Sequence, residues 1–191
     1  MYNNYKKDLE YGQMKERVTL NVMREVYGLE GISDNESNKH DIVLNNSCIC
    51  EVKADKYIKG TRNIWLEYCG NIQQDHEGWL IYSDCQLLAY HVVEPSEPYR
   101  TIKILFLDFR GLKHYVENEY FDGDFSNPES MFANTAMKKN AKAILIPPNE
   151  FQQFVICVYS TLEKREIYIN PSYSSLKDFT ESIAKVCPLS A

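Results

Sequence analysis

The stretch HDIVLNNSCICEVKAD, residues 40–55, decides the fold of this chain. It predicts two short apolar strands joined by a tight Asn-Asn-Ser turn, which is the pattern of a β-hairpin. Residues two apart in a strand point to the same face. Glu51 and Lys53 therefore project together, while Cys50 and Val52 face the other way. The second strand of the hairpin thus carries one charged face and one apolar face.

The first strand adds a third charge to this group. Asp41 begins that strand, and the hairpin brings its carboxylate alongside Glu51 and Lys53. Two carboxylates and an ammonium on one sheet face are costly to desolvate unless they bind something. The usual partner of such a cluster is a hard divalent cation that holds a phosphodiester. The hairpin therefore predicts a metal site.

The elements around the hairpin have a definite order. Apolar spacing predicts an amphipathic helix over residues 8–27 that ends near Gly28. Strands at 41–44, 48–54 and 64–68 would form an antiparallel meander. Ser83 could cap a helix that continues through His91, and 102–109 has the composition of a buried strand. The predicted order is helix, three strands, helix, strand.

Residues 110–191 are harder to interpret. They suggest a helix at 111–119, a strand at 143–146, a strand pair at 151–159 and 165–169, and a final amphipathic helix at 175–186. No stretch has the composition of a linker between domains. We therefore expect one elaborated α/β domain over residues 1–191, with a core at 8–109 and an extension at 110–191 packed on it.

Charge and hydropathy narrow the class of protein. The net charge of −6 counts mildly against tight nonspecific nucleic-acid binding, although the local balance from Lys53 to Arg62 is basic. No apolar run approaches the roughly 18 residues of a membrane span. The N-terminal residues are polar and lack the apolar segment of a signal peptide. We expect a cytoplasmic protein, of a bacterium or a phage-infected host cell, with no membrane partner.

The cysteines indicate core packing. Their spacing contains no CxxC pair and no histidine spacing typical of structural zinc. Without a secretory signal, a disulfide framework is not expected. Free cysteine behaves as a small hydrophobic residue, which is the role we predict for these six.

The hairpin motif and the element order together resemble the PD-(D/E)XK nuclease superfamily, and its small phage-type members in particular. The matching residues are Asp41 and the triplet Glu51-Val52-Lys53, with His40 where the family usually has proline. The resemblance covers roughly residues 8–109. It implies a restriction-endonuclease-like αβββαβ core, a mixed sheet flanked by helices, with a C-terminal α+β elaboration.

The resemblance also implies a set of metal ligands. They are the carboxylates of Asp41 and Glu51 and the backbone carbonyl of Val52, which would hold Mg²⁺ or Mn²⁺. Many family members add a glutamate from the first helix. Glu16 is the best match for it in this chain, and Glu10 is the second choice.

The implied chemistry is hydrolysis of DNA phosphodiester bonds by an endonuclease. The metal polarises a phosphoryl oxygen and lowers the pKa of a bound water. Lys53 can orient or deprotonate the attacking water and stabilise the developing charge. The loop after the second strand supplies candidate DNA-backbone contacts, which are Lys56, Lys59, Thr61 and Arg62. Because many relatives dimerise, a homodimer is an open alternative.

Two other functions fit the same sequence. The chain could keep the nuclease fold without efficient cleavage and act as a DNA-binding or protein-binding module. It could also be an acidic inhibitor or DNA mimic, in which the negative charge itself does the work. The intact set of Asp41, Glu51 and Lys53 favours the nuclease, because a module without catalysis has no need of three mutually costly groups.

Overall fold

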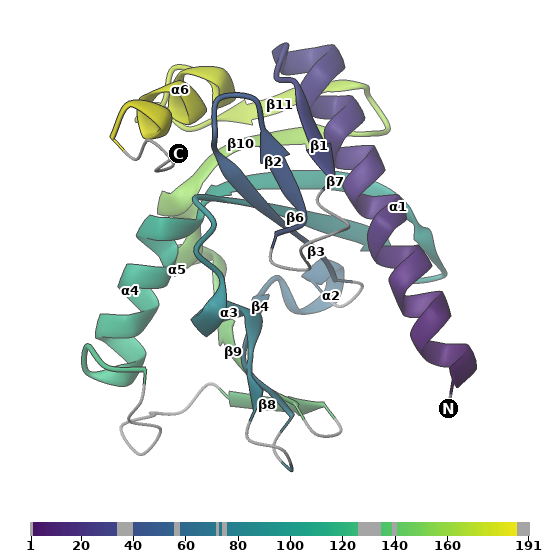
Figure 1. Cartoon of the computed structure of the whole chain (residues 1–191), viewed down its shortest axis with the longest axis vertical. Helices are drawn as coiled ribbons and strands as arrows, with labels where there is room; N and C mark the ends of the chain where they lie inside the picture. Colours follow the sequence, from purple (N-terminus) through teal and green to yellow (C-terminus); the bar gives the residue numbers. More distant parts are fainter. Residues whose placement is uncertain are drawn as a thin grey trace.

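The computed structural model describes residues 2–33, 40–55, 58–71, 73, 76–125, 135–138 and 141–186. Figure 1 shows their arrangement. The helices are α1 (Tyr2–Tyr27), α2 (Ile58–Thr61), α3 (Trp79–Tyr82), α4 (Phe109–Phe121), α5 (Pro148–Phe151), the 3₁₀ helix η2 (Gln152–Phe154) and α6 (Leu176–Val186). The strands are β1 (Gly31–Ser33), β2 (Ile42–Leu44), β3 (Ile49–Asp55), β4 (Ile64–Asn71), β5 (His76–Glu77), β6 (Leu87–Glu94), β7 (Glu97–Asp108), β8 (Thr135–Lys138), β9 (Ala141–Ile146), β10 (Val155–Ser160) and β11 (Arg165–Ile169).

The strands form two sheets. The larger sheet has seven strands in the order β1-β2-β3-β6-β7-β10-β11, and the smaller has four in the order β5-β4-β9-β8. In the larger sheet, β3 and β6 are parallel and the other neighbours are antiparallel. The predicted α/β class with a mixed sheet flanked by helices is therefore confirmed.

The predicted hairpin is present as β2 and β3. Ile42 lies opposite Cys50 across the pair. The Leu44 amide donates to the Cys48 carbonyl at 2.9 Å, and the Ser47 amide donates to the Leu44 carbonyl at 2.8 Å. Ser47 has a φ of 66°, the left-handed conformation that closes a hairpin loop of this length. Local turn chemistry thus fixes the register of the pair.

The larger sheet buries both of its faces. On one face the core includes residues of α1 and α6, and on the other it includes residues of α4, α3 and the smaller sheet. The alternation along β3 follows this division. Ile49 packs toward the smaller sheet, whereas Cys50 and Val52 pack toward α1, as predicted. Figure 1 shows α1 running along one side of the larger sheet and the smaller sheet lying beyond the end of β3.

The predicted third strand of the meander is present but has different partners. β4 pairs with β9, with Leu66 opposite Ile144, and therefore belongs to the smaller sheet. The antiparallel meander consists of β1, β2 and β3 instead, with Ile32 opposite Val43. The prediction was wrong because β6 occupies the free edge of β3. Alternation along a strand identifies its buried face but not its neighbour.

The predicted helix from Ser83 through His91 was also wrong. Residues 87–94 form β6, the central strand of the larger sheet, and Leu87 through His91 are buried without a break. A strand covered on both faces is apolar throughout, and its short run cannot be distinguished from a buried helix by periodicity. The short helix α3 comes before Ser83.

The other predicted elements are confirmed, with small changes of boundary. α1 stops where Gly28 adopts a left-handed φ of 63°. β7, α4, β9, β11 and α6 overlap their predicted ranges, whereas the strand predicted from 151 begins at Val155, after α5 and η2. The extension after residue 110 supplies strands to both sheets, so it forms part of the architecture that surrounds the hairpin.

Core packing, predicted for all six cysteines, is confirmed for four of them. Cys48, Cys50, Cys85 and Cys157 are buried free thiols, and Cys69 is a partly exposed one. Cys187 lies outside the described residues. None of the helices in the described ranges combines the length and the apolar character needed to cross a membrane.

Candidate functional site

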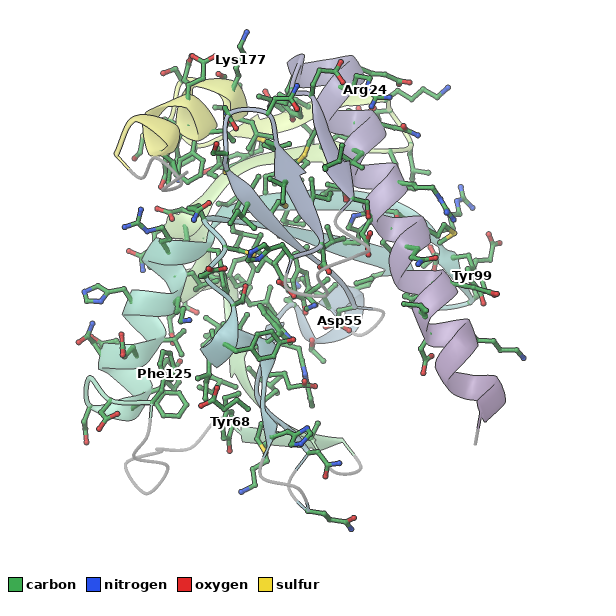
Figure 2. The ribbon with its side chains drawn as sticks, in the orientation of Figure 1. Arg24, Asp55, Tyr68, Tyr99, Phe125 and Lys177 are labelled. Carbon is green, nitrogen blue, oxygen red and sulfur yellow. The ribbon has the colours of Figure 1, made fainter. Side chains whose placement is uncertain are left out.

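The three charged residues of the hairpin meet on one face of β3. The Lys53 ammonium forms an ion pair with Glu51 Oε1 and lies 3.9 Å from Asp41 Oδ2. The Glu51 side chain is only 4% exposed, whereas those of Lys53 and Asp41 are 30% and 28% exposed. The cluster therefore has a buried side and a side open to a ligand. Asp55, the last residue of β3, is labelled in Figure 2 and shows where this end of the strand lies.

Glu51 is held by the segment between α3 and β6. Its Oε2 accepts a hydrogen bond from Ser83 Oγ at 3.2 Å and a weaker one from Cys85 Sγ at 3.6 Å. The parallel pairing of β3 with β6 places Glu51 opposite Leu88 and so brings this segment to the carboxylate. A buried carboxylate needs such donors. Sequence analysis missed both of them because it assigned Ser83 to a helix cap and Cys85 to the core.

Asp41 is fixed by the backbone of the neighbouring strand. Its Oδ2 accepts a hydrogen bond from the Val52 amide at 2.7 Å. Burial raises the pKa of Asp41 to about 6, and the charges of Glu51 and Glu16 raise it too, although Lys53 and the Val52 amide oppose the change. The two carboxylates of the cluster face a single ammonium, so a formal negative charge remains that no group of the cluster neutralises. A cation would therefore be stabilised here.

Lys53 stays an ammonium in this environment. Burial lowers its pKa, but the carboxylates of Glu51 and Asp41 raise it more, and the net change is upward. A lysine with a raised pKa is a poor proton acceptor at neutral pH. Of the two roles predicted for Lys53, orientation and charge stabilisation fit this environment, and deprotonation of water does not.

A cavity of about 360 Å³ adjoins the charged cluster. It is lined by Lys53, Ala54, Asp55, Trp65, Glu67, Trp79 and Tyr90. The Lys53 ammonium lies 5.2 Å from the centre of the Trp79 ring, within the range of a cation–π contact. Tyr90 lies opposite Lys53 in the parallel pair β3–β6. The cavity thus combines aromatic walls with the ammonium of the cluster.

Hydrogen bonds through Tyr90 join the cavity wall to the larger sheet. The Tyr90 hydroxyl donates to Asp55 Oδ2 at 3.0 Å and accepts from the Trp65 amide at 2.8 Å. The first bond connects β6 to β3, and the second connects β6 to the smaller sheet. The Tyr90 hydroxyl therefore links the β3 side of the cavity to its β4 side.

The position of Trp79 depends on a close approach between α3 and β4. The Gly78 amide donates to the Tyr68 carbonyl at 2.8 Å. A Cβ at position 78 would lie 2.2 Å from the Glu67 carbonyl oxygen, so this approach requires glycine. Glycine at this position thus lets Trp79 pack beside Lys53.

The remaining predicted site residues lie at the margin. Glu16 accepts a hydrogen bond from Ser33 Oγ, and its charge contributes to the raised pKa of Asp41. Lys59 forms an ion pair with Glu94 at 3.0 Å, so its charge is already partly compensated. The side chains of Thr61 and Arg62 are exposed on or beside α2, and Lys56 lies outside the described residues. The metal and DNA roles proposed for these residues stay predictions.

The raised pKa of Asp41 leads to a measurable expectation. In the metal-free protein the Asp41 carboxyl should titrate with a midpoint near 6, well above its ordinary value of 3.8. A carboxyl-directed NMR titration with Asp41→Asn for assignment measures it. Addition of Mg²⁺ should move the midpoint downward, because a bound cation favours the carboxylate. A midpoint near 4 without metal would contradict the description of the site.

Comparison with other proteins identifies no relative. No protein-family model, no curated protein and no solved structure matches this chain. The function must therefore be argued from the site itself.

Proposed function

We propose that this chain is a metal-dependent nuclease that hydrolyses DNA phosphodiester bonds at the cluster of Asp41, Glu51 and Lys53. The observation that carries the proposal is the position of the Lys53 ammonium, which pairs with Glu51 and lies 3.9 Å from Asp41 beside an aromatic cavity. The site thus brings together carboxylates that can bind a cation, an ammonium that can bind a phosphate, and aromatic rings that can stack on a base.

The residues of the cluster fit Mg²⁺ or Mn²⁺. Both ions prefer oxygen ligands, which Asp41 and Glu51 supply directly and which the Val52 carbonyl and Glu16 are predicted to add. Two carboxylates paired with one ammonium leave a formal negative charge on the cluster, which a divalent cation would neutralise. Once bound, such an ion polarises a phosphoryl oxygen and lowers the pKa of a bound water.

The residues of the chain would then act by position and charge. The Val52 amide holds the Asp41 carboxylate, and Ser83 holds that of Glu51, so neither has to be ordered during the reaction. Lys53 contacts the scissile phosphate and stabilises the negative charge that develops on its oxygens. Trp65 and Trp79, on the cavity wall, stack against a base next to that phosphate.

The order of elements supports the restriction-endonuclease-like core. α1 precedes the antiparallel strands β1, β2 and β3, and after a crossover that includes α3, β6 pairs in parallel with β3. If α2, β4 and β5 are treated as an insertion between β3 and α3, this order resembles αβββαβ, with the acid beside β2 and the Glu-x-Lys on β3. The comparison rests on topology, so it supports the fold and leaves activity to experiment.

A cleavage assay with purified protein tests the proposal, with duplex, single-stranded and branched DNA as substrates. We expect cleavage with Mg²⁺ or Mn²⁺, no cleavage with chelator, and a loss of at least about 100-fold in Asp41→Asn. The matched control is Asp122→Asn, because Asp122 is an exposed residue at the end of α4 whose left-handed φ of 51° asparagine tolerates. Equal metal-dependent activity in Asp41→Asn and wild type would refute the proposal, as would no cleavage of any substrate.

A further inference from the structure

A second group of ligand atoms lies next to the charged cluster, at the start of β2. His40, Asp84 and Cys85 each direct one atom to a common point, and these atoms all lie within 4.8 Å of one another. They are an imidazole nitrogen, a carboxylate oxygen and a thiol sulfur. His40 precedes β2 and the other two precede β6, so the fold brings together residues that are distant in sequence.

The imidazole of His40 is an independent sign of a missing partner. Its Nδ1 is buried and makes no hydrogen bond within the described part of the chain. Asp84 Oδ1 lies 3.3 Å away, but this contact does not have the geometry of a hydrogen bond. Buried polar atoms almost always have a partner, and leaving one unsatisfied is costly. A ligand bound between the two atoms would satisfy both.

The spacing suits a tetrahedral metal ion. Ligand bonds of about 2.0–2.1 Å to nitrogen and oxygen place two tetrahedral ligands roughly 3.3–3.4 Å apart. The separation of 3.3 Å between His40 Nδ1 and Asp84 Oδ1 agrees with this spacing. The Cys85 sulfur lies within 4.8 Å of one imidazole nitrogen of His40 and one carboxylate oxygen of Asp84, so a side-chain adjustment would complete the third bond.

We propose that His40, Asp84 and Cys85 bind a transition-metal ion of the Zn²⁺ class, at a site separate from the Mg²⁺ site of the nuclease. Imidazole and thiolate ligands select zinc over magnesium, which prefers oxygen. The cysteine loses its proton to solvent as the metal–sulfur bond forms, and its weak hydrogen bond to Glu51 Oε2 is lost with that proton, whereas the bond from Ser83 stays. Three protein ligands leave one tetrahedral position open.

A pocket lies beside two of the three proposed ligands. Asp84 and Cys85 line a pocket of about 400 Å³ together with Arg110, Lys113 and His114. Asp84 itself is 74% exposed, whereas Cys85 is buried. An ion in this pocket would therefore be in contact with two of the three proposed ligands, Asp84 and Cys85. A bound ion would join the start of β2 to the segment that holds Glu51.

Metal binding to chelator-treated protein tests the inference without measuring cleavage. We expect Zn²⁺ to bind one equivalent by calorimetry and to raise the Tm, since a ligand of the native state stabilises it. Co²⁺ in place of Zn²⁺ should give a sulfur-to-cobalt charge-transfer band in the near ultraviolet. Excess Mg²⁺ should leave both results unchanged.

Variants of the three ligands make the test specific. His40→Gln, Asp84→Asn and Cys85→Ser should each weaken Zn²⁺ binding by more than about tenfold, and Cys85→Ser should lose the charge-transfer band. Because Asp84 is exposed, Asp84→Asn keeps the test valid if a buried variant fails to fold. Cys69→Ser is the matched thiol control and should bind as wild type does. Absence of binding, or full affinity in Asp84→Asn, would overturn the inference.

Discussion

Lys53→Met is expected to reduce metal-dependent DNA cleavage by about 10²- to 10⁴-fold. The substitution keeps an unbranched side chain that is shorter by one atom, and it removes the ammonium that pairs with Glu51 and lies 3.9 Å from Asp41. The scissile phosphate then loses its only nearby cationic partner from the hairpin. Initial cleavage rates at saturating Mg²⁺ measure the effect.

Lys177→Met is the control for this loss. Lys177 is an exposed lysine on α6 that forms an ion pair with Glu181, one turn away, and Figure 2 shows it at the opposite end of the molecule from the smaller sheet. We expect wild-type cleavage in this variant. Since Lys53→Met leaves the buried Glu51 without its ion pair, circular dichroism must show that the variant is folded. A folded Lys53→Met protein with full activity would contradict the role given to the ammonium.

Acid should destabilise the protein through His91, at the contact between α1 and the larger sheet. His91 is fully buried on β6, and its Nε2 and Nδ1 lie 2.7 Å from Thr19 Oγ1 and 2.9 Å from Thr101 Oγ1. Burial and the nearby Lys15 ammonium lower the pKa of His91 to about 3. The folded protein therefore keeps this imidazole neutral at pH values where the unfolded chain protonates it.

The sign of the effect follows from proton uptake. Below a pH of about 6.5 the unfolded state binds more protons than the folded state, so the free energy of unfolding decreases as the pH falls toward 3. The limiting slope from one such histidine is about 1.4 kcal/mol per pH unit. In His91→Gln, the free energy of unfolding should change less steeply with pH, by nearly this amount, between about pH 6 and pH 4. Urea unfolding at a series of pH values measures it.

The difference between wild type and His91→Gln reports on His91 alone, because both proteins contain all the other titrating groups. Asp41, whose pKa is raised, contributes in the opposite direction in both proteins. The pKa of Lys15 is lowered only to about 8, so Lys15 is charged throughout this range. His76→Gln, at an exposed histidine on β5, should follow wild type. Parallel curves for wild type and His91→Gln would contradict the prediction.

The hairpin could be predicted from the sequence because its information is local. Alternation in β3 determines which side chains share a face, and the turn residues determine the register with β2. The faces of Glu51 and Lys53, and the approach of Asp41, follow from these two rules. The charged part of the site therefore needed no knowledge of the rest of the fold.

The aromatic cavity could not be predicted in this way. It depends on β6 lying parallel to β3, which puts Tyr90 beside Lys53, and on β4 joining β9 in a separate sheet. Both pairings join distant residues, and periodicity carries no information about partners. A strand assignment for residues 87–94, together with its parallel pairing to β3, would have placed Tyr90 near the cluster and Ser83 near Glu51. Because a helix was predicted there instead, neither placement could be predicted.

The separation of β4 from its partner β9 has a consequence for folding. The β2–β3 hairpin closes a short loop, whereas β4 (Ile64–Asn71), which also pairs with the nearby β5, cannot complete its sheet until β9 (Ala141–Ile146) is available. Contacts between residues far apart in sequence form slowly, because the loop between them must close first. During synthesis the charged hairpin should therefore form well before the wall that carries Trp65. The growing chain would then present the proposed cation ligands while the proposed surface for a base is still missing.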